Sequence, residues 1–121
     1  EEARERWEDS RPASYVFALE RLCFCGSRGP VRVRIQGISV ERVYVDSGSP
    51  VPSTMAELFP TVDGLFDILV SALEGDAHEI RATYDPATGV PTDFWIDYLE
   101  FAIDEELGMR VTEEVEAVGG P

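Results

Sequence analysis

Hydrophobic and polar residues alternate along much of the first half of the chain, which is the period of a half-buried β-strand. The first run has apolar residues on one parity, with Arg21 interrupting it: Tyr15, Phe17, Leu19, Cys23 and Cys25. The next run reads as a hairpin that turns at Gln36 and Gly37, and its apolar positions are Val31, Val33, Ile35, Ile38, Val40, Val43 and Val45. Because the parity changes after Val40, we predict a β-bulge near Glu41 and Arg42.

A helical period replaces this alternation at residues 61–74. Thr61 is a suitable N-cap and Gly75 a suitable stop, and between them lies an apolar stripe of Val62, Leu65, Phe66, Leu69, Val70 and Leu73. We expect Leu65, Phe66 and Leu69 at its centre to be buried against a sheet. A shorter helix is predicted before Pro12, with Trp7 as its docking residue.

Alternation resumes in the second half of the chain and predicts two or three more strands. Ile80, Ala82 and Tyr84 lead into the turn sequence DPATG, Phe94, Ile96 and Tyr98 follow it, and a last strand runs from about Met109 to Val118. Short connections require antiparallel pairing, and one amphipathic helix needs one sheet face to cover. The predicted fold is α+β: an antiparallel sheet of five or six strands, one amphipathic helix packed on a face and a short N-terminal helix.

The length of 121 residues is that of a single domain. We expect residues 7–118 to form its core and residues 1–6 and 119–121 to fray.

Four fragments in order resemble one bacterial family, the domain of unknown function 6174. They are Tyr15-x-Phe17 followed by Cys23-Phe24-Cys25, TVDGLFD at residues 61–67, YDPATGVP at residues 84–91, and a stretch from Asp97 that ends in DEE at Glu106. The resemblance extends from about Trp7 to Val115 and departs at Val90, where such sequences often carry an aromatic residue. It implies a secreted or lipoprotein-anchored domain of the cell envelope, with a cytoplasmic protein as the alternative. It implies no activity.

Charge narrows the classes of partner. The chain has 24 Asp and Glu against 10 Lys and Arg, a formal net charge of -14. Nucleic-acid binding needs a basic surface that neutralises phosphates, and this sequence offers none. No stretch approaches the roughly 20 apolar residues that span a bilayer. We therefore expect a protein or another envelope component as partner, with no nucleic acid and no transmembrane segment.

Cys23 and Cys25 are the first candidates for chemistry. Two positions apart on a strand, their side chains point to the same face, so they could form one disulfide, act as a thiol redox pair, or bind a soft metal. A metal would need further ligands, and the sequence has one His and no other Cys. The disulfide is the favoured interpretation.

Acidic residues near the C-terminus are the second candidate. Asp97, Asp104, Glu105 and Glu106 lie close together in the sequence, and calcium prefers several carboxylate oxygens. Their spacing matches no EF-hand, and a solvated acidic loop is the alternative. No other cofactor and no catalytic set is expected, so the sequence favours a protein that is not an enzyme.

Trp95 is the third candidate, for an interaction surface. It follows Phe94 on one strand, and neighbouring side chains of a strand lie on opposite faces. If Phe94 is in the core, Trp95 is either covered by the N-terminal helix or exposed as an anchor for a partner. The leading hypothesis is a non-enzymatic binding module. A small calcium-binding module and a thiol redox protein are the alternatives.

Overall fold

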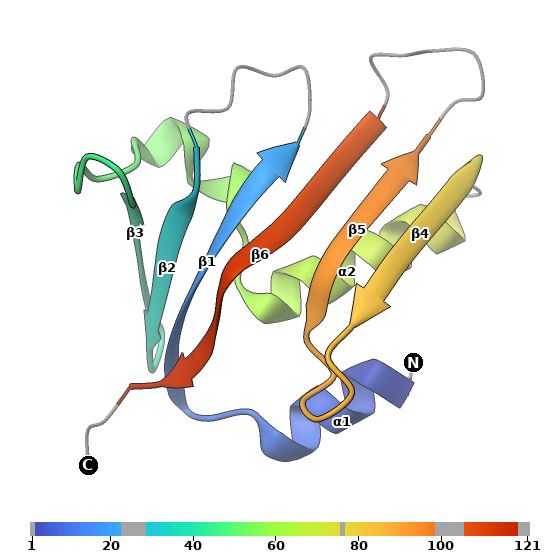
Figure 1. Ribbon diagram of the computed structural model, residues 1–121, viewed down its shortest axis with the longest axis horizontal. Coiled ribbons are helices and arrows are strands. Elements are labelled where there is room, and N and C mark those ends of the chain that lie inside the picture. The colour runs from blue at the N-terminus through green and yellow to red at the C-terminus, as the bar shows by residue number, and fades with distance from the viewer. Residues whose placement is uncertain (1, 23–28, 76, 99–105, 119–121) are drawn as a thin grey trace.

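The computed structural model shows one antiparallel sheet with a helix across one face (Figure 1). It describes residues 2–22, 29–75, 77–98 and 106–118. The elements follow in the order α1 (Glu2–Ser10), β1 (Ser14–Leu22), β2 (Val31–Gln36), β3 (Ser39–Tyr44), the 3-10 helix η1 (Ser53–Leu58), α2 (Val62–Glu74), β4 (Glu79–Tyr84), β5 (Pro91–Asp97) and β6 (Glu106–Ala117). In the described part of the chain the sheet has six strands in the order β3-β2-β1-β6-β5-β4. The predicted α+β class is confirmed.

Two local hairpin systems make up the sheet, and the long-range pairing of β1 with β6 joins them. β1, β2 and β3 pair in chain order, as do β4, β5 and β6. The last strand therefore returns beside the first, where Leu19 lies opposite Val111. β6 begins at Glu106, three residues before the predicted start, so Glu106 belongs to a strand.

The predicted bulge near Glu41 and Arg42 is wrong. The register between β2 and β3 runs without a shift from Val31 opposite Tyr44 to Gln36 opposite Ser39. The apolar parity breaks because Arg42 takes a position on the helix-covered face, where its guanidinium donates to the carbonyl of Phe59. In the described chain, register shifts occur instead between β1 and β6 and at the end of the β4–β5 pair.

Helix α2 has the caps that the sequence predicts. The Thr61 hydroxyl accepts a hydrogen bond from the backbone N–H of Gly64 at 3.1 Å, and the N–H of Gly75 donates to Ser71 at the other end. The buried residues of the helix are Val62, Leu65, Phe66, Leu69 and Ala72. Leu65, Phe66 and Leu69 are buried as predicted, but Leu73 is 61% exposed, because Ala72 occupies the last inward position of the stripe.

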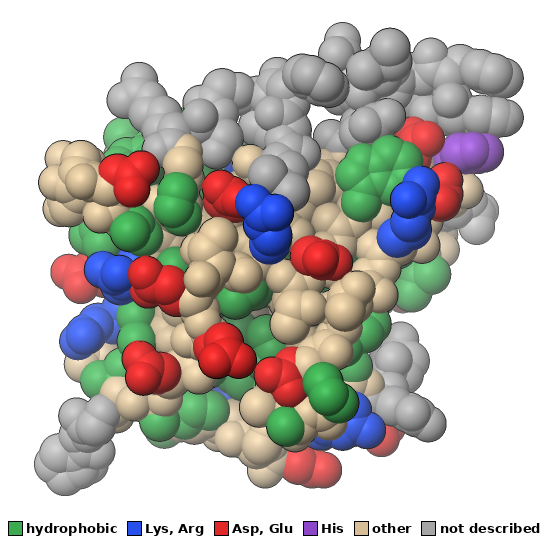
Figure 2. All heavy atoms as spheres, in the orientation of Figure 1, with side chains coloured by type: hydrophobic (Ala, Val, Ile, Leu, Met, Phe, Trp, Pro, Cys, Tyr) green, Lys and Arg blue, Asp and Glu red, His purple; other side chains and the backbone are tan. Residues whose placement is uncertain are grey.

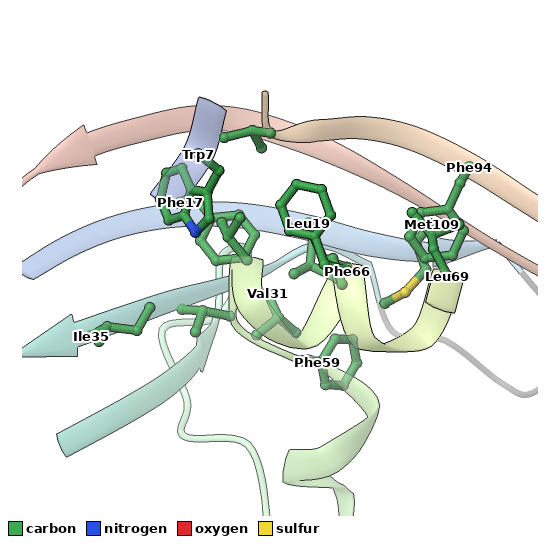
Figure 3. Close-up of a cluster of buried hydrophobic side chains, with 14 of the residues drawn as sticks. Trp7, Phe17, Leu19, Val31, Ile35, Phe59, Phe66, Leu69, Phe94 and Met109 are labelled. Atoms are coloured by element: carbon green, nitrogen blue, oxygen red, sulfur yellow. The ribbon is translucent and has the colours of Figure 1, made fainter. Parts of the chain in front are cut away.

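The core lies between α2 and the sheet, and its rings and aliphatic side chains come from nearly every element (Figure 3). Phe17, Leu19 and Val31 point from β1 and β2 toward α2, and Phe94 and Met109 do so from β5 and β6. Two partly buried arginines fasten η1 to this layer: Arg21 donates to the carbonyl of Leu58 and Arg42 to that of Phe59. Burial lowers the pKa of both guanidinium groups.

Helix α1 packs onto the core through Trp7, which is 1% exposed. The prediction that Trp7, the only large apolar residue of this helix, is its docking residue is confirmed. The indole packs edge-on against Tyr15, with ring centroids 5.2 Å apart, and its N–H donates to the carboxylate of Asp63 at 3.1 Å. α1 also touches the β4–β5 turn, because Gly89 approaches the backbone of Ala3 closely. Among the described residues, no helix has the length and apolar character needed to span a membrane.

The environment of Tyr15 predicts that the folded protein loses stability at alkaline pH. Its hydroxyl accepts from the backbone N–H of Val62 at 3.2 Å, and burial, reinforced by the nearby charge of Asp63, raises its pKa to about 12. The unfolded pKa is about 10, so the native state holds the proton longer than the unfolded chain does. The stabilisation is complete below about pH 10 and is lost as the pH rises toward 12.

We therefore expect the free energy of unfolding to fall more steeply with pH in the wild type than in Tyr15→Phe above about pH 10. Urea unfolding followed at several alkaline pH values measures this difference. Parallel curves for the two proteins would show that Tyr15 ionises as readily in the folded state as in the unfolded chain.

Candidate functional site

The face of the sheet that turns away from α2, here the open face, is the candidate site. Where β4, β5 and β6 pair with one another, its outward side chains are Glu79, Arg81, Thr83, Asp93, Trp95, Asp97 and Arg110, and Gly108 takes the outward position opposite Trp95. In the part of the chain that the structure describes, α1, α2 and η1 lie behind or below the sheet and leave this face uncovered (Figure 1). Figure 2 shows acidic and basic side chains interspersed over it, with separate hydrophobic ones between them.

Trp95 lies near the middle of β5 on this face. Phe94 and Ile96, its neighbours in the strand, are buried on the opposite face, while Trp95 is half-buried. The alternative that the N-terminal helix covers Trp95 is wrong, because α1 packs through Trp7 against Tyr15 and Asp63 on the α2 side of the sheet. Trp95 is therefore an aromatic side chain on an open sheet surface.

Two residues shape the surroundings of the Trp95 ring. The guanidinium of Arg81, opposite Trp95 on β4, lies 4.9 Å from the ring centroid and makes a cation–π contact. On the other side, Gly108 of β6 lies opposite Trp95 and offers no side chain. The ring thus borders a hollow on its β6 side.

That hollow is a shallow depression of about 400 Å³. Its outward lining residues are Arg81, Thr83, Asp93, Trp95, Gly108 and Arg110. A comparable depression of about 390 Å³ lies beside the 46–52 loop, and one of about 320 Å³ lies between Arg11 and Gly37. The depression at Trp95 differs from these two in combining a partly exposed tryptophan ring with charged neighbours.

Ion pairs organise the arginines of the open face. Arg81 pairs with Glu79 at 2.8 Å, Arg32 pairs with Glu113 at 2.9 Å, and Arg110 pairs with Glu20. Arg32 makes a bidentate contact, and this hydrogen bonding raises its pKa. Exposed pairs of this kind stabilise folding little. They hold these three basic charges against acidic ones, while Arg34 of β2 on the same face is exposed and forms no ion pair within the described chain.

The acidic candidates are only partly placed by the structure. Asp97 ends β5 and lies opposite Glu106, the first residue of β6, whereas Asp104 and Glu105 lie outside the described residues. Among the described side chains, no group of three His, Cys, Asp or Glu is close enough to hold a metal ion. Glu79, which lies opposite Asp97 on β4, was missed by the sequence reasoning because only the register brings it there.

Asp97 differs from the other acidic residues in its burial. It is 8% exposed, and its Oδ1 has no hydrogen-bond partner within the described chain. A buried carboxylate is ordinarily hydrogen-bonded, paired or bound to a metal. Its position at the end of the open face makes it the most unusual polar group of the site.

Cys23 and Cys25 lie outside the described residues, so the predicted disulfide and the redox alternative remain predictions. β1 ends at Leu22, just before them. Arg21, which interrupts the apolar run, lies opposite Met109 and faces the α2 layer.

The fold and the open face define a small sheet-and-helix domain with a mixed, acidic sheet surface. Residues 1–116 match the family of unknown function DUF6174, and the chain belongs to that family. No curated protein and no solved structure matches this chain.

Proposed function

We propose that this protein is a non-enzymatic interaction module that acts outside the cytoplasm and binds a partner protein on its open face through Trp95. The observation that carries the proposal is the position of Trp95, half-buried beside a depression of about 400 Å³ on a sheet face that no described helix covers. Tryptophan is among the residues that contribute most to binding energy at protein interfaces. The resemblance to secreted and lipoprotein-anchored domains supports the location.

The charge of the open face supports a basic partner segment. Three of its arginines, Arg32, Arg81 and Arg110, are already paired with glutamates, whereas, among the described residues, the exposed Arg34 is not. Asp93 and Glu116 also form no ion pair within the described chain. The whole chain carries a formal net charge of -14. A segment rich in Lys or Arg would be attracted to this surface and oriented by it.

The geometry suggests how such a segment binds. Gly108 leaves room for a partner side chain to pack flat against the β6 side of the Trp95 ring, while Arg81 closes the β4 side. Asp93 lies two residues from Trp95 on the same face and opposite Arg110. A cationic side chain of the partner could reach Asp93 while its neighbour fills the depression.

Selection from a displayed peptide library tests this proposal. Peptides are selected on the wild-type protein alone, and their binding to the wild type and to Trp95→Ala is then measured. We expect Lys- and Arg-rich sequences that bind the wild type, and whose Kd rises at least about tenfold in Trp95→Ala, a change equivalent to about 1.4 kcal/mol. The physical reason is that the mutation removes the aromatic surface and leaves the charges.

Ile38→Ser is the matched control. Ile38 is fully exposed in the β2–β3 turn, away from the depression, so its removal takes away a surface hydrophobic residue without touching the site. Binding to this variant should equal wild-type binding. If the selected peptides bind Trp95→Ala as tightly as the wild type, or lose affinity equally in both variants, Trp95 is not the anchor.

A further inference from the structure

Strand β6 has a long stretch with an unpaired edge inside the sheet. It pairs with β1 as far as Ala117, whereas its pairing with β5 ends at Arg110. The β4–β5 turn does not continue beside β6 but folds toward α1, where Gly89 approaches the backbone of Ala3 (Figure 1). Within the described chain, residues 111–117 therefore have a strand on one side only. We call their unpaired side the free edge of β6.

Irregularities in the β1–β6 pair explain why β6 separates from β5. The register shifts between Val16 and Ala18 and again between Ala18 and Leu19, and in both places β6 carries one residue more than β1. An extra residue bends a strand and increases its twist, so β6 turns away from β5 beyond Arg110. Pro91, the first residue of β5, has no N–H with which to extend a ladder. The gap between β5 and β6 is therefore a consequence of their own sequences.

The backbone of Ala117 faces this gap. The N–H of Val118 donates to the carbonyl of Ser14 on β1 at 2.9 Å. Hydrogen-bonded and non-hydrogen-bonded positions alternate along an antiparallel pair, so the N–H of Ala117 points away from β1. An edge with free N–H and C=O groups is a template for pairing with another extended chain.

The two outer edges of the sheet are less suited to such pairing. The segment after β3 folds back along it, so that the N–H of Tyr44 donates to the carbonyl of Ser49 at 2.9 Å. β4 carries the ion pair of Glu79 and Arg81, and charged side chains on an edge strand discourage pairing with a second chain. The free edge of β6 is thus the edge that the structure leaves open.

A hollow of about 180 Å³ lies beside the free edge of β6. Val111 and Val115 line it and are half-buried against the core, and Val90 of the β4–β5 turn lies on its other side. Val111 lies opposite Leu19, so this apolar surface is on the α2 side of the sheet. A strand added to the free edge would place every second side chain against it.

Acidic side chains dominate the surroundings of the free edge. Asp85 and Glu114 line the hollow, and the exposed Glu116 lies on the open face. None of these three forms an ion pair within the described chain. Arg110, at the start of the gap, already pairs with a glutamate of β1, and the exposed Arg34 lies on β2, two strands away.

We propose that the free edge of β6 binds an extended segment of a partner protein as an added strand, and that this segment alternates apolar and basic residues. Main-chain hydrogen bonds provide affinity in this mode of recognition, and pockets for alternate side chains provide specificity. The hollow accepts the apolar side chains, and the unpaired carboxylates attract the basic ones. A second copy of the chain would bring the same acidic side chains together, so the charge favours a basic partner. The inference is independent of Trp95, since it rests on strand pairing.

NMR titration with a synthetic peptide tests the free edge. The probe is the blocked peptide KVKVKVK, and its control KKKVVVK has the same composition without the alternation. The probe should shift the amide signals of residues 111–117, and hydrogen exchange of the Ala117 amide should slow at least about tenfold. The Val118 amide should change little, because it already donates to Ser14. Trp95→Ala should bind the probe like the wild type, which separates this site from the depression at Trp95.

Ala117→Pro and Ala117→Val form a matched pair of variants. Proline removes the N–H that faces the gap and leaves the hydrogen bond from Val118 to β1, and strands tolerate proline where their N–H faces solvent. The Kd of the probe should rise at least about tenfold in Ala117→Pro, whereas Ala117→Val, which keeps the N–H, should bind within about twofold of the wild type. Thermal unfolding shows whether Ala117→Pro keeps the fold.

Two N-methylated probes repeat the test on the unchanged protein. One is methylated on the amides of its valines and the other on those of its lysines, and these two sets of N–H groups lie on opposite edges of an extended peptide. Because only one edge pairs with β6, one probe should bind at least about tenfold more weakly than the other. The proposal is overturned if KVKVKVK shifts no amide of residues 111–117, if a folded Ala117→Pro binds it like the wild type, or if both methylated probes bind equally.

Discussion

Replacing Phe66 with alanine should destabilise the protein by about 3 to 5 kcal/mol, the usual range for removing a buried phenylalanine. Phe66 is 4% exposed and lies at the centre of the buried face of α2. Its ring stacks on Tyr84 of β4 with centroids 6.4 Å apart, and the guanidinium of Arg4 lies 5.6 Å from it. The substitution therefore removes one side chain that joins α2, β4 and α1.

Small domains are stable by only about 5 to 15 kcal/mol, so this loss should lower Tm by roughly 10 to 25 °C. Chemical and thermal unfolding both measure it. Leu73→Ala is the control on the same helix, because Leu73 is 61% exposed and its truncation should change stability by about 0.5 kcal/mol or less. Equal effects of the two substitutions would show that α2 turns a different face to the sheet.

Replacing Gly89 with alanine should cost about 2 to 5 kcal/mol, from a strained backbone and an overpacked contact together. Gly89 has a φ of +83°, which L-residues rarely adopt. A Cβ at this position would lie 2.0 Å from the carbonyl oxygen of Ala3. Since that atom belongs to the backbone of α1, no side-chain rotation relieves the clash.

Gly37→Ala separates the two causes. Gly37 also has a positive φ, +60°, but a Cβ there would meet nothing within 4 Å. We expect this control to lose only the strain of the left-handed conformation, about 1 to 2 kcal/mol. Urea unfolding gives both values, and the emission of Trp7 should shift to longer wavelength in Gly89→Ala as α1 moves away. Identical losses would contradict the close approach of α1 and the β4–β5 turn.

Most elements of the fold follow from local pattern. Each such pattern arises because one face of the element is buried. Examples are the alternating residues Tyr15, Phe17 and Leu19 of β1 and the helical stripe around Phe66. Arg42 shows where this reasoning fails. Its charge at an inward position led to the prediction of a bulge. The carbonyl of Phe59, which accepts its hydrogen bond, lies 17 residues further along the chain, so the local pattern could not reveal it.

The candidate site was predicted less completely than the fold, because it depends on long-range register. Trp95 could be found from its neighbour Phe94, but only the packing of α1 on the other face shows that this helix does not cover it. Asp97 and Glu106 were named as one acidic group, while Glu79 joins them through the β4–β5 pairing. Val90, the departure from the family pattern, is a buried core residue and not an exposed turn side chain.

The two tryptophans of the chain provide the most direct test of partner binding on the open face. In a ¹H–¹⁵N NMR spectrum each contributes one indole N–H signal, and the N–H of Trp7 is held by Asp63 on the opposite side of the sheet. The protein is titrated with the tightest basic peptide from the selection. The account predicts a saturable shift of the Trp95 indole signal and of β5 and β6 amides, with the Trp7 signal unchanged. A peptide that shifts the Trp7 signal and leaves Trp95 in place would contradict it.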